Sequence, residues 1–266
     1  MSTPQDEEAR IVQNKQVGPH LFVMRLETSL ISKRALPGQF VHMKIPEIQA
    51  HILRRPFSLY AVDKDNGTLD ILYQVVGAGS KHMASLVKGQ KLDIIGPIGN
   101  TWTFPDNTQK ALLIGGGVGA APLFMLAKKL IASHIVVDVV IGAQTKSALV
   151  CHERYEALVA TCSKKSSSLY CSTDDGSFGY SGFCTGLVKE LLDKNHYEYA
   201  AICGPEPMMK NVFGLFKNRD IVCQVSMEKR MACGIGACLS CVVETTGGRK
   251  RACVDGPIFQ ASEVVF

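Results

Sequence analysis

The first hundred residues contain short hydrophobic stretches that alternate with polar positions and are separated by glycine turns. These stretches are HLFVMRLE (20–27), QFVHMKI (39–45), FSLYAV (57–62) and TLDILYQVV (68–76). Strands of this length and spacing are typical of an antiparallel barrel or sandwich. The periodicity is lost over residues 94–110, which indicates the exit from this domain.

After Lys110 the pattern changes to strands and helices in alternation. The sequence predicts strands at 111–117, 136–143, 168–173, 199–204 and 221–226, with helices over 120–133, 151–161, 184–194 and 205–218. This order predicts a doubly wound parallel α/β sheet, a class that binds nucleotides at its carboxyl edge. We therefore expect a β-barrel domain at 1–108, an α/β domain at 109–226 and a small C-terminal module at 227–266.

Composition excludes several other classes of protein. The net charge of +5 is modest and its Lys and Arg residues are mostly dispersed, so we expect no nucleic acid partner. The uncharged run at 111–127 contains four glycines and a proline, which divide it into a strand, a turn and a helix start rather than a membrane span. The acidic opening MSTPQDEEAR does not resemble a signal peptide, so a cytoplasmic location is expected.

Four of the ten cysteines lie close together near the C-terminus. Cys233, Cys238, Cys241 and Cys253 have the spacing C-x4-C-x2-C-x11-C, and the first three match the plant-type ferredoxin pattern. The loop between them is rich in glycine and small residues, which lets a backbone wrap around a cluster. A two-iron, two-sulfur cluster ([2Fe-2S]) is the favoured interpretation. Structural zinc and unligated thiols are the alternatives.

Two turns of the predicted α/β domain are candidates for binding a nicotinamide nucleotide. The stretch GGGVGAAP (115–122) follows a predicted strand and precedes a predicted helix, as a pyrophosphate site requires. A tight turn with a purely structural role is the alternative, because it would have the same sequence pattern. CGPEPMMK (203–210) ends a later strand of the same sheet, so Cys203 is expected to face the same crevice, beside a nicotinamide. The candidate residues are Gly115, Gly116, Gly117, Gly119, Cys203, Gly204 and Pro205.

The barrel half contains residue types that suit a flavin dinucleotide. In LRRPFSLY (53–60), Arg55 provides a charge for a pyrophosphate, Phe57 a flat ring and Ser58 a small hydrogen-bonding group. VVGAGSKH (75–82) offers a second phosphate cradle. The alternative for each arginine is an ordinary position on the solvated surface.

These motifs together resemble a known family. The order R-P-F-S, G-A-G-S, G-G-G-V-G-A-A-P and C-G-P-E-P-M-M is similar to that of ferredoxin reductases, which pair an FAD-binding barrel with a nicotinamide-binding α/β domain. The loop MEKRMACGIGACLSC with ACVDGP resembles the electron-transfer subunits of type B dihydroorotate dehydrogenases. The resemblance extends from LPGQF (36–40) to the final ASEVVF.

The resemblance implies a relay among NAD, FAD and the cluster that serves a separate FMN-bearing catalytic subunit, in a heterotetramer with two copies of each chain. Cys203 is the candidate catalytic residue, and the four clustered cysteines are the implied iron ligands. Phe57 stands where many members of the wider family have tyrosine, so a hydroxyl at the flavin edge is missing. The implied FAD contacts are Arg55, Pro56, Phe57, Ser58, Leu72, Tyr73, Gln74, Gly79 and Ser80.

Other functions remain open at this point. The same modular plan suits the flavin subunit of a ferredoxin-dependent NADPH transhydrogenase, a sulfhydrogenase or a sulfite reductase, and a zinc-stabilised nucleotide-binding module is the non-enzymatic alternative.

The turn STDDGSFG (172–179) favours NAD over NADP, because Asp174 or Asp175 is placed to accept from a ribose hydroxyl and would repel a 2′-phosphate. A solvated turn is the alternative there.

Overall fold

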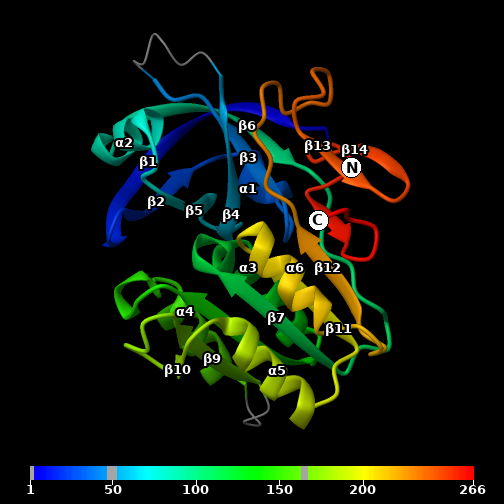
Figure 1. Cartoon of the computed structure of the whole chain (residues 1–266). Coiled ribbons are helices and arrows are strands. Elements are labelled where there is room, and N and C mark those ends of the chain that lie inside the picture. Colours follow the sequence, from blue (N-terminus) through cyan, green and yellow to red (C-terminus); the bar gives the residue numbers. More distant parts are fainter. Residues whose placement is uncertain (1–2, 47–52, 163–166) are drawn as a thin grey trace. The chain divides into compact units, whose positions relative to one another are not determined.

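The computed structural model describes residues 3–46, 53–162 and 167–266. Contacts divide the chain into two compact units, and Figure 1 shows the elements of each. The first unit comprises Met1–Thr101 with Met227–Ile258, and the second comprises Trp102–Ser226 with Phe259–Phe266. The segment that carries the clustered cysteines therefore packs within the same unit as the N-terminal barrel.

The first unit contains a closed antiparallel barrel with the strand order β1-β2-β5-β4-β3-β6, which confirms the predicted barrel. All four stretches predicted as strands lie in it. The sequence did not predict its first and last strands, and β6 occupies the start of the stretch that was interpreted as an exit. The bounds are β1 (Gln5–Gly18), β2 (Leu21–Glu27), β3 (Phe40–Met43), β4 (Arg55–Asp63), β5 (Thr68–Gln74) and β6 (Lys91–Ile98), with α1 (Ile31–Arg34) and α2 (Ala78–Ser85).

Alternation along the strands builds the barrel core. Met24 and Leu26 of β2 and Ile71 of β5 are completely buried, as expected for side chains on one face of a strand. Arg25, which lies between Met24 and Leu26 on β2, forms an ion pair with Asp70 on the neighbouring strand β5 at 2.7 Å. The barrel thereby holds the RPFS strand, β4, between β5 and β3.

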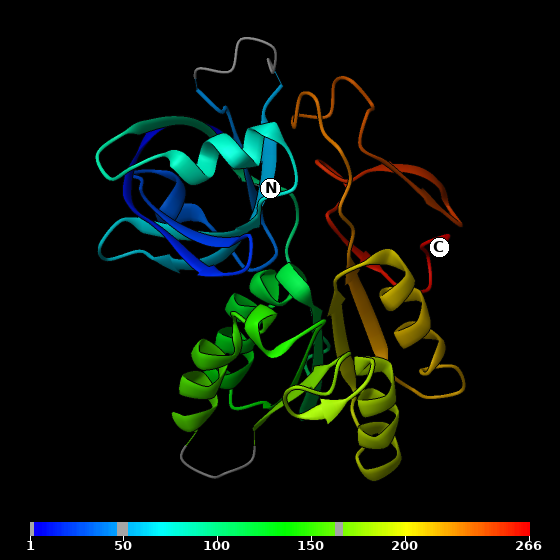
Figure 2. The ribbon, with the colours of Figure 1, turned by 60° about the vertical axis from the view of Figure 1, so that its left-hand side comes forward.

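The second unit contains a seven-stranded sheet with the order β10-β9-β8-β7-β11-β12-β15, and the pairs from β10 to β12 are parallel. Figure 2 shows α3 and α4 on one face of this sheet and α5 and α6 on the other. The strand order reverses at β7, so the carboxyl ends of β7 and β11 form the expected nucleotide crevice. The bounds are β7 (Lys110–Gly116), α3 (Ala120–Ala132), β8 (Val136–Ala143), α4 (His152–Ala160), β9 (Ser168–Thr173), β10 (Tyr180–Ser181), α5 (Cys184–Lys194), β11 (Tyr199–Cys203), α6 (Glu206–Gly214), β12 (Val222–Ser226) and β15 (Ile258–Gln260).

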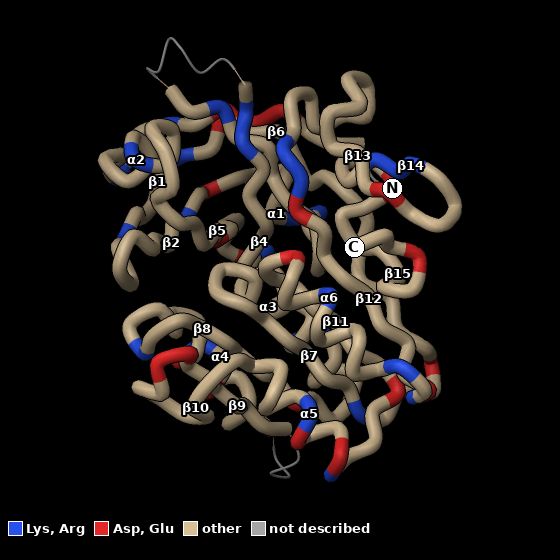
Figure 3. The backbone as a smooth tube through the Cα atoms, in the orientation of Figure 1, with Lys and Arg blue, Asp and Glu red and all other residues tan. Residues whose placement is uncertain are grey.

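The C-terminal segment adds a two-stranded hairpin of β13 (Val242–Thr245) and β14 (Gly248–Arg251) between the third and fourth clustered cysteines. Basic and acidic positions are interspersed along the chain, as the colours in Figure 3 show. Within the described residues, none of the helices combines the length and the hydrophobicity that crossing a bilayer requires.

Candidate functional site

The four clustered cysteines form two pairs in the first unit. The Sγ atoms of Cys241 and Cys253 are 3.3 Å apart, and the backbone N–H of Cys238 points at Cys233 Sγ at 3.4 Å. Within the described part of the chain, no three His, Cys, Asp or Glu side chains are grouped to hold a metal ion. Structural zinc takes four ligands on one ion, whereas each iron of a [2Fe-2S] cluster takes two protein ligands. The two pairs fit the cluster better than zinc.

The backbone of the cysteine loop has the curvature expected from its glycines. Gly234 and Gly236 have φ angles of 70° and 85°, which residues other than glycine rarely adopt. Arg251 of β14 donates to the carbonyl oxygen of Gly236 at 3.2 Å and pairs with Asp255 at 3.3 Å. These contacts brace the loop against the segment that carries Cys253.

The thiols of the two pairs differ in acidity. Hydrogen bonding to the Ser240 hydroxyl, then to the Ser240 backbone and to Cys233, lowers the pKa of the exposed Cys238 thiol to about 6. Burial, and then the neighbouring Cys241 thiol, raises the pKa of Cys253 to about 12. Because iron binds thiolates, assembly of the cluster must release protons from the buried thiols of Cys241 and Cys253.

The two adjacent arginines at the start of the RPFS strand have different partners. Arg54 Nη2 donates to both carboxylate oxygens of Asp93 on β6, at 2.7 and 2.8 Å, and Nη1 donates to the Asp93 backbone carbonyl oxygen at 2.9 Å. Among the described residues, Arg55 donates only to the backbone carbonyl oxygens of Leu53 and Arg54. Its Nε lies 4.0 Å from the position that a Cβ on Gly79 would occupy. The structure therefore joins Arg55 to the predicted GAGS phosphate cradle and gives Arg54 a structural role.

That cradle is the first turn of α2. The Ser80 hydroxyl accepts from the backbone N–H groups of Val76 and Gly77 at 2.9 and 3.1 Å, so this side chain caps the helix. A Cβ built on Gly77 would meet nothing within 4 Å. An open helix N-terminus beside a guanidinium suits a pyrophosphate.

The other predicted flavin contacts lie on neighbouring strands. Phe57 of β4 and Tyr73 of β5 form an edge-on aromatic pair, with ring centroids 6.1 Å apart. The Tyr73 hydroxyl donates to Asn14 at 3.0 Å, and burial raises the pKa of Tyr73 to about 12, so this side chain belongs to the barrel interior. The remaining candidates differ in exposure, with Leu72 buried, Pro56 and Ser58 half-buried and Gln74 exposed.

In the second unit the two predicted nicotinamide turns touch each other. A Cβ on Gly119 would lie 2.5 Å from the carbonyl oxygen of Cys203, and one on Gly204 would lie 3.1 Å from Gly116 Cα. Gly117 has a φ angle of 56° and open space around it. Gly115 packs against Ala120 at the start of α3. The glycines thus bring the ends of β7 and β11 together, with Cys203 half-buried and Pro205 as the N-cap residue of α6.

The turn after β9 distinguishes between its two aspartates. The Asp175 carboxylate accepts from the backbone N–H and hydroxyl of Ser177 at 3.0 and 2.6 Å, which lowers its pKa. Asp174 is exposed, and its carboxylate makes no hydrogen bond or ion pair with any residue that the structure describes. Asp174 is therefore the aspartate available to a ribose hydroxyl.

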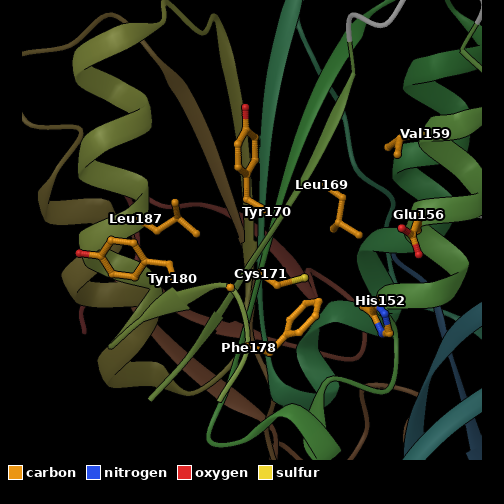
Figure 4. A pocket seen from close by; sticks show the side chains of 10 residues that line it. His152, Glu156, Val159, Leu169, Tyr170, Cys171, Phe178, Tyr180 and Leu187 are labelled. Atoms are coloured by element: carbon orange, nitrogen blue, oxygen red, sulfur yellow. The ribbon is translucent and has the colours of Figure 1, made fainter. Parts of the chain in front are cut away.

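Sequence reasoning missed an aromatic pocket beside this turn. A pocket of about 470 Å³ opens beside β9 and the edge strand β10, and Figure 4 shows its lining side chains from α4, β9, β10 and α5. Phe178 belongs to both the pocket and the turn, and it contacts the His152 ring and the Lys146 ammonium group. Lys146 is a cation beside the turn where the sequence had shown no arginine. Only the fold brings residues 146 and 178 together.

The fold and these sites define a ferredoxin reductase-like flavoprotein with an added iron–sulfur domain. Three family models match in order: an oxidoreductase FAD-binding domain at 8–102, an oxidoreductase NAD-binding domain at 113–213, and the iron–sulfur cluster binding domain of dihydroorotate dehydrogenase B at 228–265. These matches confirm the predicted FAD, NAD and iron–sulfur cofactors. The residue assignments within each site stay predictions.

The chain belongs to the family of electron transfer subunits of dihydroorotate dehydrogenase B (NAD(+)). It is 38% identical to the subunit of Enterococcus faecalis, with 96% of this chain and 97% of that protein covered. It is 34% identical to the subunit of Desulforamulus reducens, with 97% and 98% covered.

Two solved structures extend the comparison. The structure of an NADH-dependent reduced ferredoxin-NADP oxidoreductase, described for flavin-based electron bifurcation, matches with a TM-score of 0.87 and 29% identity over 97% of this chain and 89% of that one. A ferredoxin NADP+ reductase from Neisseria gonorrhoeae shares the fold, with a TM-score of 0.69, 18% identity, and 85% and 100% of the two chains covered.

Proposed function

We propose that this chain is the electron-transfer subunit of an NAD-dependent dihydroorotate dehydrogenase of pyrimidine (UMP) biosynthesis. In this function it relays electrons between the FMN of a separate catalytic subunit and NAD. The observation that carries the proposal is the cysteine loop, whose two thiol pairs pack in the same compact unit as the flavin-binding strand. When bound, FAD exchanges a hydride with the nicotinamide and single electrons with the cluster.

The residues of the first unit hold the flavin and the cluster. Arg55 and the N-terminus of α2 bind the FAD pyrophosphate, while Phe57 and Ser58 contact the flavin from β4. Each thiol pair binds one iron: the first pair is Cys233 and Cys238, and the second is Cys241 and Cys253. The distances and partners above support these roles, because each provides the charge or the thiolate pair that its group requires.

The residues of the second unit orient the nicotinamide nucleotide. The glycine turn after β7 approaches the pyrophosphate through Gly117, and Cys203 lies beside the nicotinamide. Asp174 accepts from the ribose hydroxyls, and Phe178 supplies an aromatic surface for the adenosine end. Two observations support this placement. Gly117 has open space around it, and the Asp174 carboxylate has no partner among the residues that the structure describes.

The partner docks on the cysteine loop. Ile235 and Leu239 flank the exposed Cys238 and are 60% and 62% exposed. Hydrophobic side chains of this exposure beside a redox site are typical of an interface core. We propose that the FMN-bearing catalytic subunit covers them, in a cytoplasmic heterotetramer with two copies of each chain.

The test is an assay of dihydroorotate-dependent NAD reduction. It compares this chain alone, the FMN-bearing subunit alone and the two together. The proposal predicts NAD reduction only with both chains, because this chain provides the NAD site and the partner provides the dihydroorotate site. Appreciable dihydroorotate oxidation by this chain alone would refute the division of labour.

A ferredoxin-dependent NADPH transhydrogenase subunit is the second candidate. The observation in its favour is the TM-score of 0.87 with the ferredoxin-NADP oxidoreductase chain, together with Lys146 beside the Asp174 turn. Equal or faster reduction of the bound flavin by NADPH than by NADH would favour the transhydrogenase. A preference for NADH fits both candidates, because the structural relative is itself NADH-dependent, and the dihydroorotate assay with the FMN-bearing subunit then decides between them.

A further inference from the structure

His42 lies between the flavin-binding strands and the cysteine loop. It is the third residue of β3, where its backbone is paired with Pro56 of β4 on one side and with Ile95 of β6 on the other. Its side chain is completely buried. Both ring nitrogens are shielded from solvent, and neither makes a hydrogen bond of ordinary length with a described residue. Burial lowers the pKa of His42, and the nearby backbone of Arg54 and Cys233 only partly opposes that effect.

The ring of His42 faces the loop next to an implied iron ligand. A Cβ built on Gly234 would lie 2.5 Å from His42 Nδ1, 3.2 Å from Cγ and 3.3 Å from Cε1. Gly234 directly follows Cys233. Any larger residue at 234 would therefore collide with the imidazole, and the glycine lets the ring edge approach the Cys233 end of the loop.

An imidazole carries at least one ring N–H in either protonation state. Leaving such a donor buried without a well-placed acceptor is destabilising, so a native fold rarely keeps one unless another group completes the site. The cysteine loop beside Nδ1 is where the iron–sulfur cluster binds. Thiolate and sulfide sulfur atoms accept hydrogen bonds, and such bonds tune the potential of a cluster.

We propose that His42 is a positioning residue for the iron–sulfur cluster, and that its ring N–H donates a hydrogen bond to a sulfur atom at the Cys233 end of the bound cluster. The strand that pairs with the RPFS motif thereby also sets the electronic properties of the cluster. This inference rests on the cluster assignment within the proposed function, and it does not depend on which partner accepts the electron.

The direction of the effect follows from charge. Reduction adds a negative charge to the cluster, so a donated hydrogen bond stabilises the reduced form more than the oxidised form. Removing the donor in His42→Leu should decrease the equilibrium constant for one-electron reduction about tenfold, or about 59 mV for a one-electron couple. His42→Gln, which retains an N–H donor of similar reach, should restore most of the loss.

The experiment uses the full chain with FAD and cluster bound. Midpoint potentials are measured by titration monitored with electron paramagnetic resonance, alongside iron and sulfide content, for the wild type, His42→Leu and His42→Gln. The matched control is His82→Leu, because His82 Nε2 in the same unit is also buried without a partner in the described chain but lies on α2. The control should leave the cluster potential unchanged.

A second measurement keeps the proposal testable if His42→Leu fails to assemble the cluster. The reduced wild-type cluster, in protein labelled with ¹⁵N-histidine, should show a weak hyperfine coupling to a histidine nitrogen by pulsed paramagnetic resonance. Absence of that coupling, or an unchanged potential in a cluster-loaded His42→Leu variant, would overturn the inference. If the coupling is present but the dihydroorotate assay fails, the proposed function is wrong and this inference stands.

Discussion

Arg54 and Arg55 show how two identical neighbours acquire different roles. Arg54 is held by the Asp93 carboxylate, while Arg55 extends toward the open first turn of α2. Sequence alone did not distinguish them, because the acidic partner of Arg54 lies on β6, a strand that the hydrophobic pattern did not reveal. The contact between β4 and β6 is a property of the barrel, not of the local sequence.

Arg55→Ala should weaken FAD binding. A hydrogen bond to a charged group contributes about 1.5–3 kcal/mol, so the dissociation constant should rise by about ten- to a hundredfold. Equilibrium dialysis of FAD measures this directly. The control is Arg10→Ala, which removes a surface ion pair with Glu27 on the same barrel and should leave FAD affinity unchanged. Unaltered FAD binding by Arg55→Ala would show that the pyrophosphate lies elsewhere.

Cys238→Ser should abolish the cluster but retain the flavin. The exposed thiol is one member of a thiol pair, and serine does not replace a thiolate ligand to iron. Iron and acid-labile sulfide should fall to background, while FAD content and bleaching of the flavin by NADH persist. Cys162→Ser, at a half-buried position in the other unit, is the control. A full complement of iron in Cys238→Ser would make the ligand assignment wrong.

Asp174→Asn should reduce the preference for NADH over NADPH. The substitution removes the charge that repels a 2′-phosphate, so the ratio of kcat/KM for the two nucleotides should fall about tenfold. Steady-state reduction of an artificial acceptor gives that ratio. Asp175→Asn, whose carboxylate is occupied by Ser177, should change the ratio less. The opposite ranking of the two variants would move the ribose contact to Asp175.

At the scale of elements, the sequence predicted most strands and helices because their hydrophobic periodicity is strong. The strand β1 escaped prediction for a physical reason. Within its first seven residues only Ala9 and Ile11 are buried, so polar side chains dominate and no alternation is visible. Its place in the barrel comes from pairing with β2 and β6. Likewise, α2 begins within a glycine-rich stretch that was interpreted only as a cradle.

β1 also contributes a cap to another element. The Glu7 carboxylate accepts hydrogen bonds from the backbone N–H groups of Leu30 and Ile31, at 3.1 and 3.0 Å, and from both the N–H and the hydroxyl of Ser29. Burial acts to raise the pKa of Glu7, but the hydrogen bonds from Ser29 and Ile31 outweigh it, so the pKa lies below its ordinary value. This single side chain satisfies the start of α1.

Glu7→Gln should make the barrel less stable at neutral pH and less sensitive to acid. A carboxyl whose folded pKa is lowered contributes stability above its unfolded pKa and loses it as the pH falls through the folded value. We expect a loss of about 1 kcal/mol at neutral pH that disappears below about pH 4. Urea unfolding at both pH values measures the difference.

The neighbouring Glu8 provides the control for that experiment. Glu8 makes an exposed ion pair with Lys91, so Glu8→Gln should change the free energy of unfolding by less than about 0.5 kcal/mol. A cost of Glu7→Gln that is the same at neutral and acidic pH would contradict the assigned role of the carboxylate.

At the scale of the whole molecule, the order of motifs predicted the modular plan because each motif is local in sequence. Four cysteines at a fixed spacing predicted the cluster, but their division into two pairs required coordinates. The grouping of the cysteine segment with the barrel, and the place of His42 between them, join residues that are almost 200 positions apart. No local pattern carries information of that kind.

The central claim is that electrons from dihydroorotate reach this chain only through a flavin-bearing partner. The most direct measurement is an anaerobic mixture in which the reduced-cluster signal is followed by electron paramagnetic resonance after dihydroorotate is added. We predict a reduced cluster when the FMN-bearing subunit is present, and an oxidised cluster when this chain is alone or when the partner lacks FMN. Reduction of the isolated chain by dihydroorotate, or an oxidised cluster in the assembled complex, would contradict the account.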